Sequence, residues 1–133
     1  MEFVVKQVKK EDFYKEYERL NSLHHFPTLN IDLLPEYAFV CFRDEIPIYC
    51  VWFWFTNSKL AVMSFVLSNK GVNYKKRLGG MKYLFIKVIE YAKKKKQKAI
   101  FFPNSNKEVS NILIELGFVE GDKGFGQYFY NIK

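Results

Sequence analysis

Short apolar stretches dominate the first half of the chain, and they follow the pattern of β-strands. These stretches are residues 2–8, 37–42, 46–56 and 60–67. Arg43–Glu45 supplies a polar turn between the second and third stretch, which predicts a hairpin. The stretches 46–56 and 60–67 are apolar at successive positions, and this indicates strands that are covered on both faces of a sheet.

A helix and a loop are expected between the first two strands. Asp12 is placed to cap the helix, and apolar residues follow it at helical spacing. Those residues are Phe13, Tyr14, Tyr17 and Leu20. Residues 24–35 contain two prolines and no regular period, so they predict a loop with a short helical turn.

The second half of the chain changes to a helical period. Its clearest amphipathic stripe comprises Met81, Leu84, Phe85, Val88, Ile89 and Ala92. A short strand at 98–102 follows, and Ser105–Glu108 has the form of a capping box for a second helix that stops at Gly117. Residues 118–120 and 127–132 bracket a glycine-rich turn and predict a last hairpin.

This order of elements predicts an α/β fold. The segment 60–102 is a strand–helix–strand unit, so its two strands are expected to be parallel with a right-handed crossover. The hairpins make the other neighbours antiparallel. We therefore expect one domain over residues 1–133, with a mixed sheet and helices on both faces, since no linker or repeat interrupts the chain.

Charge is unevenly distributed along the chain, which has a formal net charge of +7. Residues 1–66 carry seven Lys and Arg against nine Asp and Glu, whereas residues 67–133 carry fourteen against five. The basic half either faces something anionic or is a solvated, lysine-rich surface. Charge alone does not choose between these two interpretations.

The number of cysteines and the length of the apolar runs argue against a disulfide-rich or membrane-spanning protein. Cys41 and Cys50 are expected to be buried free thiols on neighbouring strands, and no metal site is expected. The longest apolar run, 46–55, has about half the length of a membrane-spanning helix, and no basic-plus-apolar leader opens the chain. These features predict a cytoplasmic protein without a membrane segment.

The segment Ser68–Met81 is the most informative for function, because it leaves a buried strand and enters a helix. Such a junction collects unpaired backbone N–H groups and the positive end of a helix dipole. Gly79 and Gly80 permit close backbone approach, and Lys75, Lys76 and Arg77 add cations directly before them. The segment therefore predicts a phosphate site, unless the two glycines only begin a helix and the cations are only solvated.

Two motifs resemble those of the GNAT family of N-acetyltransferases. Lys76–Met81 lies over the family's Q/R-x-x-G-x-G/A loop, with Lys76 in place of Gln or Arg. Asn106, Leu116, Gly117 and Phe118 fall in register with its second motif, a helix that ends in Gly-Phe. The resemblance covers roughly residues 37–132.

The resemblance implies an acyltransferase that binds acetyl-CoA as cosubstrate and acetylates an amine, the identity of which the sequence does not specify. The implied pyrophosphate site uses the amides of Leu78, Gly79, Gly80 and Met81, with Lys76 and Arg77 beside the phosphates. The pantetheine arm would lie along the backbone of Phe65, Val66 and Leu67, with Asn106 reaching toward it. On this interpretation, Gly80→Val weakens cofactor binding and leaves the fold intact.

Catalytic groups are harder to assign. Leu113 occupies the position at which many family members carry a tyrosine acid, and no carboxylate lies between Leu60 and Ser68. The remaining candidates for acid or base are Glu36, Tyr128 and Tyr130, and the loop with His24 and His25 is expected to border the acceptor.

Two other functions stay open from the sequence. A catalytically inactive CoA-binding or structural relative agrees with Leu113. A basic nucleic-acid-binding module agrees with the charge, although the aromatic residues do not interleave with the basic ones as a stacking platform requires.

Overall fold

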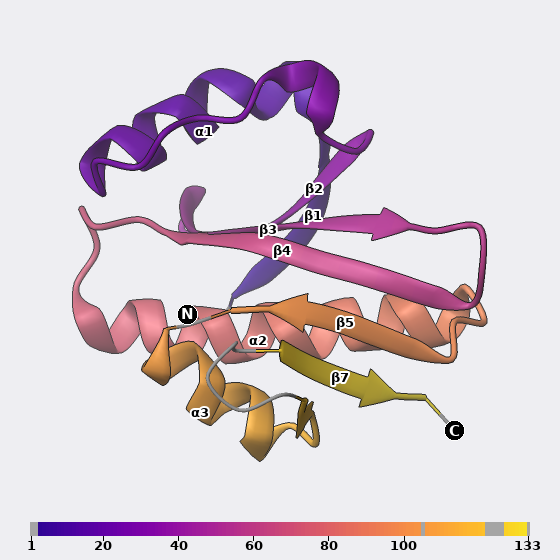
Figure 1. The fold of residues 1–133 in the computed structure, drawn as a ribbon. Coiled ribbons are helices and arrows are strands. Elements are labelled where there is room, and N and C mark those ends of the chain that lie inside the picture. The colour runs from indigo at the N-terminus through magenta and orange to yellow at the C-terminus, as the bar shows by residue number, and fades with distance from the viewer. Residues whose placement is uncertain (1–2, 105, 122–126, 133) are drawn as a thin grey trace. The chain divides into compact units, whose positions relative to one another are not determined.

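The computed structural model describes residues 3–104, 106–121 and 127–132 and contains a mixed β-sheet (Figure 1). Over these residues the sheet has seven strands in the order β1-β2-β3-β4-β5-β7-β6. The strands are β1 Val4–Lys9, β2 Tyr37–Arg43, β3 Ile46–Phe55, β4 Leu60–Ser68, β5 Ala99–Pro103, β6 Val119–Glu120 and β7 Gln127–Asn131. The helices are α1 Lys10–Leu23, the short 3-10 turn η1 Ile31–Leu33, α2 Tyr74–Lys94 and α3 Lys107–Glu115. The α/β fold class is confirmed.

The starts of α1 and α3 differ from the sequence prediction. Asp12 is wrong as the cap of α1, because the helix begins at Lys10 and Asp12 lies in its first turn. The cap of α3 is Asn106, whose Oδ1 accepts the N–H groups of Glu108 (2.9 Å) and Val109 (3.2 Å). Ser105, the first residue of the expected capping box, lies outside the described residues.

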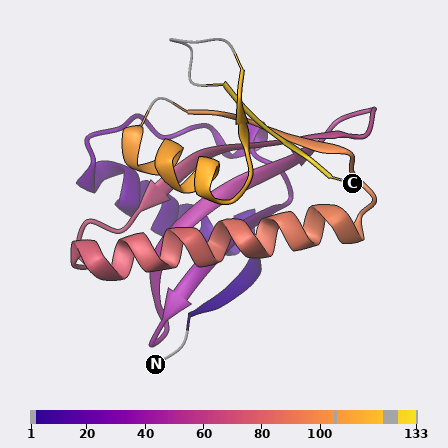
Figure 2. The ribbon, with the colours of Figure 1, turned by 90° about the horizontal axis from the view of Figure 1, so that it is seen from below.

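Contacts divide the chain into two compact units, residues 1–52 with 65–85 and residues 53–64 with 86–133. The elements β3, β4 and α2 each contribute residues to both units, and α2 is one unbroken helix (Figure 2). The expectation of a single domain stays a prediction.

The first unit has its core between α1 and the β1–β3 strands. Trp52 is fully buried, and the rings of Phe13 and Tyr17 meet it edge-on at 6.3 and 5.3 Å. Large aromatic side chains bury the most area per residue, so this cluster fixes α1 on the sheet. It also orients the loop that follows α1, because the loop begins directly at the helix end.

The β2–β3 hairpin confirms the predicted turn. Asp44 and Glu45 have φ values of 53° and 65°, as a two-residue hairpin loop of the left-handed type requires. The register passes from Cys41↔Tyr49 to Phe42↔Pro47, so Ile48 is an extra residue that bulges out of the ladder. Cys41 and the β3 residue Cys50 are buried free thiols, as expected.

The second unit contains the predicted parallel pair. Leu60–Val62 of β4 pairs with Ala99–Phe101 of β5 in parallel, and β7 pairs with β5 on its other edge. Ile100, Phe102 and Leu113 are buried in its core, and Gly117 adopts φ 100°, which ends α3 as predicted.

No helix in the described part of the chain is long and apolar enough to cross a membrane. The same residues hold no group of three or more His, Cys, Asp and Glu side chains that is arranged to bind a metal ion.

Candidate functional site

The N-terminus of α2 lies earlier than the glycine pair. Asn73 caps the helix, since its Oδ1 accepts the N–H of Lys76 (3.0 Å) and its carbonyl accepts the N–H of Arg77 (3.1 Å). The expectation that the helix opens at Gly79–Gly80 is therefore wrong. Amides from Leu78 onward lie within the helix, where N–H groups bond to the carbonyls one turn before them.

Gly79 and Gly80 instead permit close packing of α2. A Cβ on Gly80 would lie 3.0 Å from Cγ2 of Ile48, the bulged residue of β3. A Cβ on Gly79 would lie 3.2 Å from the ring of Phe3. The close backbone approach that glycine allows is used here between a helix and a strand.

The first turn of α2 has an unfavourable charge pattern for a helix. It contains no acidic residue, and Lys75, Lys76 and Arg77 all lie there. Cations near a helix N-terminus oppose the macrodipole, at a cost of about 0.3–1 kcal/mol each when exposed. A bound anion would remove this conflict, because it would meet both the cations and the positive helix end.

Arg77, one of the three cations of this turn, contacts both the end of β4 and Tyr74. Its Nη1 donates to Oγ of Ser68 at 3.5 Å, and its guanidinium lies 5.9 Å from the ring centre of Tyr74. Its Nε is buried without a hydrogen-bond partner. Buried polar atoms are usually paired, so this unpaired donor costs stability in the chain as it stands.

Asn69 fixes the loop between β4 and α2. The residue is 4% exposed; its Nδ2 donates to the carbonyl of Pro47 (2.8 Å) and its backbone N–H donates to that of Ile48 (2.8 Å). Its Oδ1 accepts the N–H of Gly71 (2.9 Å). The loop is thus tied to β3 at its first residue, which sets where the first turn of α2 lies.

His24 ties the loop after α1 to the same place. Its Nε2 lies 2.8 Å from the carbonyl oxygen of Ser68 and 3.1 Å from Oγ of that residue, and its ring stacks on Phe26 at 5.0 Å. Burial lowers the pKa of His24, the nearby cations Lys70 and Arg77 add to that effect, and the bond to Ser68 opposes it. His24 is therefore neutral, and its Nε2–H donates to the carbonyl of Ser68. His25 is exposed.

The strand β4 has an unusual backbone at Phe65. This residue has φ 55°, a left-handed conformation that a bulky side chain rarely adopts, and its side chain is about half exposed. The parallel ladder between β4 and β5 comprises three pairs among the described residues and ends at Val62↔Phe101. Strained backbone of this kind costs about 1–3 kcal/mol and gathers at functional sites.

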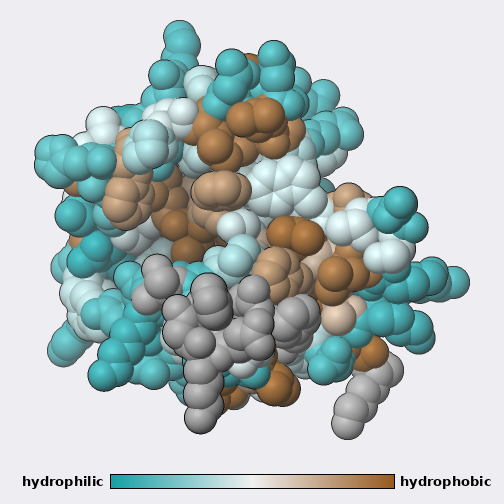
Figure 3. Space-filling model, in the orientation of Figure 1, coloured by the Kyte–Doolittle hydropathy of each residue, from teal (hydrophilic) through white to brown (hydrophobic). Residues whose placement is uncertain are grey.

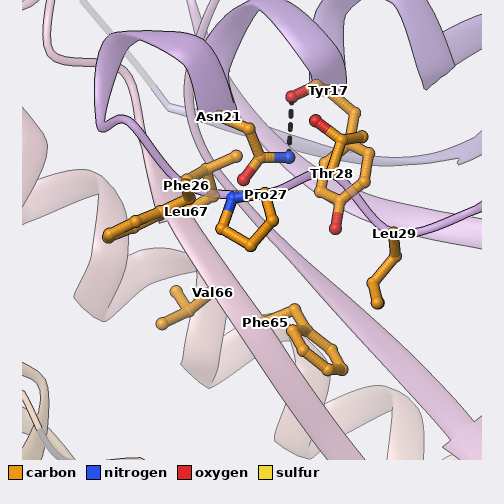
Figure 4. Close-up of a pocket in the computed structure, with 9 residues that line it drawn as sticks. All are labelled: Tyr17, Asn21, Phe26, Pro27, Thr28, Leu29, Phe65, Val66 and Leu67. Atoms are coloured by element: carbon orange, nitrogen blue, oxygen red, sulfur yellow. Dashed lines mark hydrogen bonds between the residues drawn. The ribbon is translucent and has the colours of Figure 1, made fainter.

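A cavity of about 330 Å³ lies within the first unit. Figure 4 shows that α1, the loop after it and β4 each contribute side chains to its wall. The lining residues are Tyr17, Asn21, Phe26, Pro27, Thr28, Leu29, Phe65, Val66 and Leu67. The structure thus brings together the expected site residues 65–67 and the loop that was expected to border the acceptor.

The expected catalytic residues have other contacts. Tyr128 is buried and its hydroxyl donates to Oε2 of Glu120 at 3.2 Å. The ring of Tyr130 packs on Phe118 at 5.1 Å, and Glu36 is exposed. Their catalytic roles stay predictions.

The remaining expected site residues lie in three different surroundings. Met81 and Leu113 are fully buried in the two cores, and Asn106 caps α3. Lys76 is exposed in the first turn of α2.

Sequence reasoning missed Ser68, Asn69 and Asn73 as residues that build this site. Asn73 carried a signal, because Asn is a preferred helix cap. The contact of His24 with Ser68 carried none, since 44 positions separate these residues along the chain.

No family model matches the chain, and no curated protein matches it. Solved structures do match it. A GNAT-family acetyltransferase from Staphylococcus aureus is similar with a TM-score of 0.74 at 14% identity, over 99% of this chain and 100% of that one. A Salmonella typhimurium structure that contains its cofactor acetyl-CoA gives 0.71 at 14%, over 98% and 94%. The PaiA N-acetyltransferase from Thermoplasma acidophilum, in complex with coenzyme A, gives 0.67 at 13%, over 99% and 100%. The chain therefore has the fold of GNAT acetyltransferases.

Proposed function

We propose that this chain is an N-acyltransferase that binds acetyl-CoA at the N-terminus of α2 and acetylates an amine. The observation that carries the proposal is the first turn of α2, where Lys75, Lys76 and Arg77 gather without any acidic residue. Such a turn is electrostatically unfavourable alone and favourable around a pyrophosphate. The similarity to structures that contain acetyl-CoA or coenzyme A supports this choice of anion.

The residues of the first unit fit the cofactor's groups. The first-turn cations match phosphate oxygens, which accept several hydrogen bonds at once. The backbone of Phe65–Leu67 lies beyond the last pair of the β4–β5 ladder, so the amide groups of pantetheine can run beside it as an added strand would. We thus shift the proposed phosphate contacts from the amides of residues 78–81 to the turn that begins at Asn73.

Acyl transfer asks little of the protein beyond placement. When bound, acetyl-CoA supplies the thioester: the amine nitrogen attacks its carbonyl carbon, the C–S bond breaks, and CoA leaves as the thiolate while the amine gives up its proton. Holding both reactants in one site can lower the barrier by several kcal/mol. The proposal therefore requires no tyrosine at position 113, where the fully buried Leu113 belongs to the core.

Thermal unfolding tests the cofactor. Acetyl-CoA at about a hundred times its Kd is expected to add about 2.7 kcal/mol to the free energy of unfolding, a shift of several degrees in Tm. Pantetheine, which lacks the phosphates, is expected to give a much smaller shift. Release of CoA in the presence of an amine then separates an enzyme from an inactive CoA-binding relative. A shift with a short oligonucleotide and none with acetyl-CoA would favour the nucleic-acid function instead.

A charge reversal at each end of α2 supplies a matched pair. Lys76→Glu favours the helix dipole but is expected to weaken acetyl-CoA binding about tenfold or more, because it puts a carboxylate beside the phosphates. Lys94→Glu, in the last turn of the same helix, opposes the dipole and is expected to leave binding unchanged. Equal affinities in the two variants would contradict the proposed site.

A further inference from the structure

The cavity beside β4 has walls of a consistent chemistry. Its lining includes Phe26, Pro27, Leu29, Phe65, Val66 and Leu67, and none of its nine lining residues carries a formal charge at neutral pH. Hydrophobic residues also reach the surface on the face shown in Figure 3. Phe26 and Phe65, at 53% and 49% exposed, are among the exposed apolar residues of the described chain.

The polar groups of the cavity are few, and the structure already engages some of them. Nδ2 of Asn21 donates to the carbonyl of Tyr17 at 3.0 Å, as the dashed line in Figure 4 marks. The carbonyl of Leu29 accepts the hydroxyl of Tyr14 at 2.6 Å. Burial raises the pKa of Tyr17, which keeps its phenol neutral. The cavity thus offers no anion to an incoming ammonium group.

The cavity lies against the part of β4 where we place the cofactor. Phe65, Val66 and Leu67 line it, and the same stretch of β4 is where we place the pantetheine arm. A molecule in the cavity therefore lies against the segment of backbone that guides the thioester. This step rests on the proposed function.

We infer that the cavity binds the acceptor through a single apolar group, and that the acceptor is an uncharged or weakly basic amine rather than a polycation. Its volume of about 330 Å³ is at the small end for ligand sites, which suits one aromatic or branched aliphatic group. A buried ammonium without a partner is costly, whereas the neutral amine is both tolerated and nucleophilic. The lining residues include no carboxylate that could act as a general base. Desolvation in the cavity instead lowers the amine's pKa, which favours the neutral, nucleophilic form.

Two sources carry this chemistry, a small free amine and the amino-terminal residue of a peptide. An α-amino group has an ordinary pKa near 7.7–8.0, against about 10.4 for a lysine side chain. Both sources present an apolar group beside an amine, and the experiment separates them. Lysine side chains and polyamines are expected to be poor acceptors, because their amines have a high pKa and stay protonated.

Acetyl transfer to matched amines tests the inference. Phenylalanine amide and a peptide that begins with Phe carry the apolar group beside a weakly basic α-amino group, while agmatine and a peptide that begins with Lys carry a second cation. We expect kcat/KM for at least one apolar acceptor to exceed that of its cationic counterpart by about tenfold or more. The better of the two apolar acceptors identifies the source. Equal or better turnover of agmatine and the Lys peptide would overturn the inference.

Two variants of the loop after α1 test whether the preference for apolar acceptors depends on the cavity wall. Leu29→Glu places a carboxylate in the cavity wall and is expected to remove the preference for the apolar acceptor. Leu33→Glu makes the same change at a residue that is 62% exposed and does not line the cavity, and it is expected to keep the preference. Loss of the preference in both variants, or in neither, would overturn the inference.

Binding measurements separate this inference from the proposed function. The acetyl-CoA shift in Tm is measured for every variant, and it is expected to persist in both. Phenylalanine amide is also titrated without the cofactor, with NMR amide shifts expected around residues 17–29 and 65–67. A persistent acetyl-CoA shift with no amine response at these residues overturns the cavity's role alone. An amine response there without any acetyl-CoA shift overturns the proposed function and leaves the cavity as a site for an apolar amine.

Discussion

A methyl group on Gly80 tests how closely α2 packs on β3. The Cβ of an alanine there would lie 3.4 Å from Cβ of Ile48 and 3.0 Å from its Cγ2, and the second distance is closer than ordinary van der Waals contact. The matched position is Gly79, where a Cβ would lie 3.2 and 3.3 Å from the end of the Phe3 ring. Gly79 is exposed and Gly80 is buried, so the two neighbours sample different surroundings in one helix.

The two alanine substitutions are expected to have different effects on the free energy of unfolding. Replacing glycine by alanine inside a helix gains about 1 kcal/mol from backbone propensity. At Gly79 the Phe3 ring can rotate aside, so most of this gain should remain. At Gly80 the contact is with a buried strand residue, and overpacking of a core costs about 1–3 kcal/mol, which cancels or exceeds the gain. Gly80→Val adds two further methyl groups and a β-branched side chain, and should cost more still.

Urea unfolding of the three variants measures these effects. We expect the order Gly79→Ala above the parent chain, Gly80→Ala at or below it, and Gly80→Val lowest. Each kcal/mol should appear as a few degrees in Tm for a chain of this size. Equal stabilisation by alanine at both positions would refute the packing argument. A Gly80→Val chain of parental stability with weakened acetyl-CoA binding would restore the phosphate role that the sequence predicted.

Three further predictions concern single side chains. Asn106→Ala removes the cap of α3 and should cost about 1 kcal/mol in urea unfolding, whereas Asn106→Asp should keep most of it; equal loss in both would contradict the capping role. Burial lowers the pKa of His24, so below about pH 6.5 the unfolded chain binds a proton that the folded chain resists. The free energy of unfolding should therefore be highest above about pH 6.5 and fall as the pH drops below it. His24→Gln should lose less stability between about pH 7.5 and 5.5 than the parent chain does. Burial raises the pKa of Cys41 to about 12 and that of Cys50 further, so neither thiol should react with a disulfide reagent until urea unfolds the chain, and fast labelling of the native protein would contradict their burial.

Local patterns were sufficient for the elements and their order. Successive apolar positions in 46–56 and 60–67 predicted the strands β3 and β4, and the strand–helix–strand segment predicted the parallel pair β4–β5 that the structure contains. The prediction that both strands are covered on both faces is correct for the centre of β3 and wrong for β4, which alternates between buried and partly exposed residues. These features depend on neighbours within a few residues along the chain, so sequence carries them. The fold that the motif resemblance implied is confirmed for the same reason, since those motifs are also local.

The start of α2 shows why the site was less predictable. Three cations and then two glycines disfavour a helix N-terminus locally, yet the helix begins at Tyr74 because Asn73 caps it and Gly79–Gly80 fit against Ile48 and Phe3. Tertiary packing thus overrides propensity at this point. The cavity could not be predicted from the sequence for a related reason. Tyr17 and Pro27 come from a different part of the chain than Phe65, and no local pattern predicts that they line one cavity.

The most direct test of the central claim is an amide NMR titration with acetyl-CoA. If the pyrophosphate binds at the first turn of α2 and the pantetheine arm follows β4, the largest shifts should fall on residues 65–77, and phosphate-free pantetheine should move only those of β4. Saturating acetyl-CoA that leaves the amides of Asn73–Arg77 unmoved would contradict the account.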